Sequence, residues 1–238
     1  MSDWKLKRFW DNAHVTPTAE GFAIELDGRG VKTPAKAPLI VPTQALADRI
    51  AREWNAVEEM IDPGTMPFTR SSNAAIDKVT LQHAEIADML AAYGDADLTC
   101  YRAAAPQPLT ELQAREWDPL LAWAEKTLSA RLIPVQGVMH APQNPQALRV
   151  LSDQVHALDV FALTAFHDLV SLSGSLVIGF AAMHGLHDPQ TLWRLSRIDE
   201  QWQEDQWGKD DEAMAMAARK ESDFLHAHAF YNLSRPRG

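Results

Sequence analysis

Residues 21–30 read Gly-Phe-Ala-Ile-Glu-Leu-Asp-Gly-Arg-Gly, and the fold class follows from this stretch. Its apolar side chains fall on every second position from residue 22 to residue 26, which is the pattern of a strand with one buried face. The Asp-Gly pair that follows is typical of a tight turn, because glycine adopts positive φ without steric cost. Residues 15–26 and 30–41 therefore predict short strands in a small β-rich unit.

Beyond this unit the pattern is helical, with recognisable start signals. Thr43 is suited to cap a helix because its hydroxyl can accept a backbone N–H of the first turn. Thr110 and Gln113 have the spacing of a capping box and predict another helix start. The Asn-Pro pair at 144–145 and the Asp-Pro pair at 188–189 each place proline directly after a capping residue, which marks two further starts.

These elements predict an α+β protein with two parts. We expect a β-rich N-terminal domain over residues 1–62, which ends in a helix, and an α-helical domain over residues 63–238. Several helices joined by short loops indicate that the second part is a helical bundle.

Composition and charge exclude several classes of partner. The 238 residues are 46% hydrophobic, which is enough for a packed core, and the formal net charge of −10 repels phosphate backbones and anionic membranes. The longest apolar stretch, 169–183, is interrupted by serines and glycines, so it predicts one buried core helix and no membrane insertion. Cys100 is the only cysteine, which fits a reducing compartment. Residues 1–5 lack the apolar segment of a signal peptide, so we expect the cytoplasm.

The search for catalytic chemistry finds no phosphate-binding loop, zinc-protease signature or nucleophile elbow, so we predict no catalytic residue, metal or cofactor. Asp95 and Asp97 resemble the carboxylate pair of a metal site, although a helix cap and first-turn charge explain them as well. A small metal-dependent hydrolase that uses Asp95, Asp97 and a histidine therefore stays open as an alternative.

A more informative stretch is 197–208, which reads Arg-Ile-Asp-Glu-Gln-Trp-Gln-Glu-Asp-Gln-Trp-Gly. Seven acids fall between Asp199 and Glu212, against one base, Lys209. A solvated helix face accounts for most charge runs. Tryptophan interleaved with carboxylates, however, suits a surface that binds a basic and partly apolar protein. The predicted partner-binding residues are Asp199, Glu200, Trp202, Glu204 and Trp207.

A set of short segments, in a fixed order along nearly the whole chain, carries a family resemblance. The segments are 7–10 (Lys-Arg-Phe-Trp), 26–29 (Leu-Asp-Gly-Arg), 32–34 (Lys-Thr-Pro), 50–54 (Ile-Ala-Arg-Glu-Trp), 61–63 (Ile-Asp-Pro), 66–69 (Met-Pro-Phe-Thr), 75–77 (Ala-Ile-Asp), 95–98 (Asp-Ala-Asp-Leu), 100–102 (Cys-Tyr-Arg), 117–123 and 196–208. Each segment is weak alone, but the ordered set is specific. The sequence resembles the ATP12 chaperone family.

This resemblance implies a small β-rich domain, a larger helical domain and a function without catalysis. It implies that the chain binds the unassembled α subunit of F1-ATPase and prevents its aggregation until it meets the β subunit. In the family a carboxylate of the late acidic motif is tied to function, and Glu200 matches it best, although Asp199 and Gln201 stand where glutamate is expected. We expect a monomer in the cytoplasm of a bacterium. A general holdase with broad clients is the other alternative.

Overall fold

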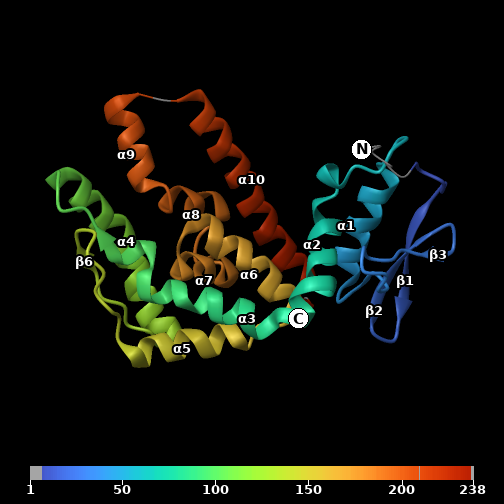
Figure 1. Cartoon of the computed structure of the whole chain (residues 1–238), viewed down its shortest axis with the longest axis horizontal. Helices are drawn as coiled ribbons and strands as arrows, with labels where there is room; N and C mark the ends of the chain where they lie inside the picture. Colours follow the sequence, from blue (N-terminus) through green and yellow to red (C-terminus); the bar gives the residue numbers. More distant parts are fainter. Residues whose placement is uncertain (1–6, 209, 237–238) are drawn as a thin grey trace. The chain divides into compact units, whose positions relative to one another are not determined.

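The structure, a computed structural model, describes residues 7–208 and 210–236. The residues on which the absence of a signal peptide was predicted, and Lys209, therefore lie outside the described residues. The α+β fold class is confirmed: four short strands at the start of the chain are followed by a long series of helices (Figure 1).

Contacts group the described residues into two compact units. The first contains the residues up to Gln82, and the chain returns to it at 159–165 and from Ala229 onward; the second contains 83–158 and 166–228. The predicted domain boundary between residues 62 and 63 stays a prediction.

The first unit is built around a small antiparallel sheet. Strand β2 (Gly21–Leu26) pairs with β1 (Ala13–Thr18), β3 (Arg29–Gly30) and β4 (Ile40–Val41). Both Asp27 and Gly28 have positive φ, at 47° and 80°, which is the geometry of the predicted hairpin turn. The alternation that predicted the strand is also present, because Ile24 and Leu26 are buried.

Helices cover this sheet and complete the first unit. Helix α1 (Gln44–Asn55) begins at the predicted cap, where the Leu46 N–H donates to Thr43 Oγ1 at 3.2 Å. The shorter elements η1 (Pro63–Thr65), α2 (Pro67–Ala74) and the π-helix η2 (Ala75–Val79) follow. Asn55 at the end of α1 accepts from the Ala13 N–H and donates to its carbonyl, both at 2.8 Å, and so satisfies part of the free edge of β1.

The second unit is helical. Its elements are α3 (Thr80–Ala91), η3 (Ala92–Ala96), η4 (Leu98–Cys100), β5 (Tyr101–Arg102), α4 (Gln107–Leu128), β6 (Val135–Gln136), α5 (Pro145–His156), α6 (Val160–Ser173), α7 (Leu176–His184), α8 (Pro189–Leu195), α9 (Ile198–Trp207) and α10 (Asp211–Ser234), of which α3, α6 and α10 also contribute to the first unit. Strands β5 and β6 form a short parallel pair. Among the described residues, no helix combines the length and the apolarity that a membrane crossing requires.

Like the start at Thr43, two further predicted helix starts are confirmed, and one is wrong. The Asn144 and Asp188 side chains cap α5 and α8, each with proline in the first turn. The capping box at Thr110 and Gln113 does not exist, because α4 already begins at Gln107 and the Thr110 hydroxyl donates to the Ala103 carbonyl at 2.8 Å. Gln113 therefore lies inside the helix, where its amide serves a different purpose.

The prediction of one continuous core helix over 169–183 is also wrong. Helix α6 ends at Ser173, Gly174 has a φ of 70°, and α7 begins at Leu176. The Ser175 hydroxyl caps α7 by accepting the Ile178 N–H at 3.0 Å. A glycine with positive φ followed by a capping serine ends one helix and starts the next.

Candidate functional site

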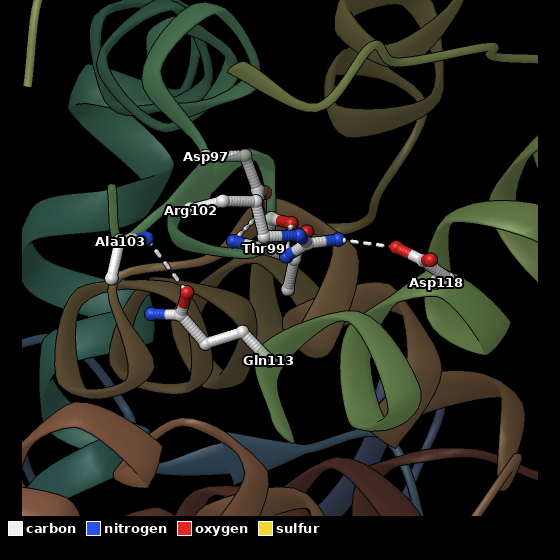
Figure 2. Close-up of polar contacts among 6 residues, drawn as sticks. All are labelled: Asp97, Thr99, Arg102, Ala103, Gln113 and Asp118. Carbon is white, nitrogen blue, oxygen red and sulfur yellow. Dashed lines mark hydrogen bonds and ion pairs between the residues drawn. The ribbon is translucent and has the colours of Figure 1, made fainter. Parts of the chain in front are cut away.

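Helix α9 carries the five predicted partner-binding residues, and a buried polar chain holds its first turn in place. Asp199 accepts a hydrogen bond from Gln113 Nε2 of α4 at 2.5 Å, and Gln113 is only 1% exposed. The other amide atom, Gln113 Oε1, accepts the Ala103 N–H at 2.7 Å, and Figure 2 shows this bond. Asp199 is therefore a structural anchor of α9 as well as a predicted contact residue.

Glu200 and Glu204 share an intramolecular cation. Arg197 NH1 lies 2.8 Å from Glu200 Oε1, and Arg197 NH2 lies 3.8 Å from Glu204 Oε1. The guanidinium also stacks over the Trp193 ring, 5.9 Å from its centroid. The Glu200 side chain is nevertheless 46% exposed, so an approaching cation can reach it.

Trp202 lines a hollow of about 180 Å³ between α4, α8 and α9. Leu112, Leu195 and Ile198 give the hollow apolar surface, and charged side chains of α4, α8 and α9 also line it. Trp202 itself is half-buried. A hollow with both apolar and charged lining can accept a side chain of a partner that has an apolar stem and a polar end.

Trp207, the last residue of α9, is 80% exposed. Its spacing from Glu200 and Glu204 is seven and three residues, which places these three side chains on one face of the helix. Asp199 and Trp202 instead face α4, as the Gln113 bond and the hollow show. The five predicted residues are thus brought together on one helix but divided between two of its faces.

The carboxylate pair suspected of binding metal is built into the fold instead. Asp97 is 0% exposed and accepts four hydrogen bonds, from the backbone N–H and hydroxyl of Thr99, the Ser175 hydroxyl and the Val177 N–H, at 2.7–3.0 Å. It caps η4, as predicted, and it also lies at the N-terminus of α7. Burial raises the pKa of Asp97 above its ordinary value. Because four protein donors already bind the Asp97 oxygens, this carboxylate is not available to a metal ion.

Asp95 has separate partners and does not share a ligand with Asp97. Its Oδ1 accepts the Gln143 N–H at 2.7 Å, and its Oδ2 lies 3.3 Å from His140 Nε2. Among the described residues, no group of three or more histidine, cysteine, aspartate or glutamate side chains is arranged to hold a metal ion. The metal-dependent alternative gains no support from this cluster.

The sequence did not assign roles to two residues of the site. Arg197 had a usable signal, because it precedes Glu200 by three residues and Glu204 by seven, which places all three on one helix face. Arg102, next to the site, also has internal partners: it donates to Asp118 at 2.7 Å (Figure 2), and its guanidinium lies over the Trp117 ring. Gln113 had no such signal, since it lies 86 positions from Asp199.

Known proteins resemble this chain in sequence and in fold. Atp12 from Paracoccus denitrificans has a crystal structure that matches with 47% identity and a TM-score of 0.95, covering 98% of this chain and all of that one. A point mutant of the same protein matches with a TM-score of 0.96 at the same identity and coverage. The Atu1473 protein of Agrobacterium tumefaciens has 36% identity and a TM-score of 0.89, over 96% of this chain and 85% of that one.

A more distant relative and a family profile agree with the structures. "Protein atp12, mitochondrial" of Schizosaccharomyces pombe is 25% identical over 219 residues, which cover 87% of this chain and 75% of the relative. The profile described as ATP12 chaperone protein matches residues 7–125, so α9 lies beyond the profile but within the part covered by the Paracoccus structures. The class of protein is therefore a chaperone. The chain belongs to the ATP12 chaperone family.

Proposed function

We propose that this chain is an assembly chaperone for ATP synthase that binds the unassembled α subunit of F1-ATPase. It prevents aggregation of that subunit until the β subunit replaces it. The observation that carries the proposal, beyond family membership, is the exposed acidic face of α9, where Glu200, Glu204 and Trp207 lie at helical spacing. No cofactor, catalytic step or nucleic acid takes part, and the protein acts as a monomer in the bacterial cytoplasm.

The physical need for such a protein explains the character of the surface. An unassembled subunit exposes the apolar area that its neighbour later covers, and exposed apolar patches self-associate. A chaperone must cover this area and then release it, which favours a moderate affinity with a charged contribution. The half-exposed Glu200 carboxylate and the exposed Trp207 ring on the same helix provide both kinds of contact.

The test is the affinity of the purified chain for the purified α subunit. We expect Glu200→Lys to weaken binding about tenfold or more, because it replaces a client-facing negative charge with a positive one. The matched control is Glu85→Lys, which makes the same charge change at an exposed position of α3. If both variants lose α binding equally, the loss is due to the net charge of the chain and not to α9.

Two further outcomes decide between this proposal and the alternatives. No interaction with α in a concentrated mixture, together with normal F1 assembly in a strain that lacks the gene, would refute the proposal. Equal protection of an unrelated aggregating protein would show a general holdase instead.

A further inference from the structure

Helix α9 and the first half of α10 form a hairpin that is exposed to an unusual degree. Helix α9 ends at Trp207 and α10 begins at Asp211, and Figure 1 shows both of these helix ends beyond α8. From Asp211 to Asp223, every residue of α10 is exposed except Ala217 and Glu221, which are half-buried. Phe224, one turn further on, is fully buried. This half of α10 therefore has no fully buried side chain.

The spacing of side chains identifies the inner face of α10. Met214, Ala217, Glu221 and Phe224 follow one another at intervals of three and four residues and so share one face. Phe224 contacts the Trp193 ring of α8 at a centroid distance of 5.8 Å. The inner face of α10 is therefore the face that looks toward α8.

A hollow of about 350 Å³ lies along this face. It is lined by Glu221 of α10, Gln201 of α9 and four residues of α8, among them Trp193 and Arg194. Met214, which is 41% exposed, is two turns beyond Glu221, or about 10 Å along the helix. The inner face therefore continues from a buried aromatic contact, past the hollow, to an exposed methionine.

Trp207 and a group of carboxylates surround the far end of the hairpin. Trp207 is the most exposed aromatic residue of the hairpin, and Asp205, Asp210, Asp211 and Glu212 are all exposed around it in the sequence. Methionine and tryptophan are side chains that adapt to, and anchor, protein partners. The carboxylates around them select against acidic partners.

We propose that the hollow and Met214, along the inner face of α10, form one docking surface for an apolar segment of the client protein that is flanked by lysine or arginine. This inference rests on the proposed chaperone function and names the surface that the function uses. A second copy of this chain is a poor occupant, because it would bring the same seven acids of residues 199–212 opposite themselves. A basic and apolar segment instead matches both the charge and the side chains of the hairpin.

The test compares two methionines of the same exposed helix. Met214 lies on the inner face, whereas Met216 is two residues further and therefore about 200° around the helix, on the outer face. Met216 is 51% exposed, so Met214→Ser and Met216→Ser remove similar side chains from similarly exposed positions without changing the charge. Circular dichroism and thermal unfolding should confirm that both variants fold as the unmodified chain does.

Affinity for the purified α subunit is then measured for the unmodified chain and both variants. We expect Met214→Ser to weaken binding about tenfold, as loss of most of a buried methionine contact predicts, and Met216→Ser to change it less than about twofold. Equal affinities of both variants and the unmodified chain, with binding still sensitive to Glu200→Lys, would overturn the docking surface and leave the chaperone function standing. Failure of the unmodified chain to bind α would overturn both. A dimer of the chain that only Met214→Ser dissociates would assign the surface to a second copy and overturn the inference.

Discussion

Replacing Gln113 with methionine should loosen the attachment of α9 to α4. Methionine keeps the unbranched shape and the helix propensity of glutamine but removes the bonds to Asp199 at 2.5 Å and from the Ala103 N–H at 2.7 Å. A hydrogen bond to a charged group contributes about 1.5–3 kcal/mol, and a buried N–H left without an acceptor costs about 1–3 kcal/mol. We therefore expect Gln113→Met to lower the free energy of unfolding by about 3 kcal/mol.

A double-mutant cycle with Asp199→Ala isolates the bond between the two side chains. The Ala103 bond is lost both in Gln113→Met and in the double variant, so its cost cancels, and the coupling energy should be about 1.5 kcal/mol or more. The matched control is the exposed pair of Gln107 and Glu111 in the same helix, whose side chains lie 2.6 Å apart and should couple by about 0.2–0.5 kcal/mol. Urea unfolding followed by tryptophan fluorescence measures both cycles. Equal coupling energies in the two pairs would refute the anchoring role of Gln113.

Two ionisable groups give further predictions. Burial, followed by the nearby Asp97 charge, raises the pKa of the Cys100 thiol to about 12, so a thiol reagent at pH 8 should label this cysteine only after unfolding in urea; rapid stoichiometric labelling of the folded chain would contradict this. The bond to Asp168, at 2.9 Å, raises the pKa of His167 above its ordinary 6.5, and Asp168→Asn should lower it in an NMR titration. A raised histidine pKa stabilises the folded state below pH 6.5, and this contribution is lost as the pH rises through the raised value. The difference in unfolding free energy between the unmodified chain and Asp168→Asn should therefore shrink above pH 6.5.

The parts of the fold that the sequence predicts are those decided by neighbouring residues. The hairpin turn at Asp27 and Gly28 needs only a residue pair that tolerates positive φ, and the caps at Thr43, Asn144 and Asp188 need only a side chain within reach of the first turn. Each of these interactions spans three residues or fewer. Local sequence therefore contains all the information that they require.

The break between α6 and α7 shows why other elements cannot be predicted this way. Gly174 and Ser175 lie within an apolar run, where small residues also suit a continuous helix packed closely against its neighbours. The start of α7 is fixed by Asp97, whose carboxylate reaches Ser175 and Val177 from about 80 positions away in the chain. A contact over that separation leaves no periodic signal near the break.

The candidate site, too, has one part that the local sequence predicts and one part that it does not. Its composition, acids interleaved with tryptophan, is a local property that can be read from residues 199–212 alone. The assignment of faces is not local. Asp199 turns toward α4 because Gln113 lies there, and Met214 lies on the inner face because Phe224 packs on Trp193. Gln113 lies 86 positions from Asp199, and Trp193 and Phe224 belong to different helices, so the division of the site into two faces required the structure.

Arg197 explains how the acidic face of α9 can be both ordered and releasable under the proposed function. The carboxylates of Glu200 and Glu204 are held by this cation before any partner arrives, which reduces the side-chain entropy lost on binding. A client lysine or arginine that approaches Glu200 must share the carboxylate with Arg197 or displace it, and this competition lowers the net gain from each ion pair. Charge then contributes mainly to the rate and orientation of encounter, while apolar contacts at Trp207 and Met214 supply most of the affinity. Such a surface binds a client quickly and yields it to a subunit that offers a larger apolar interface, because the ion pair with Arg197 re-forms as the client leaves.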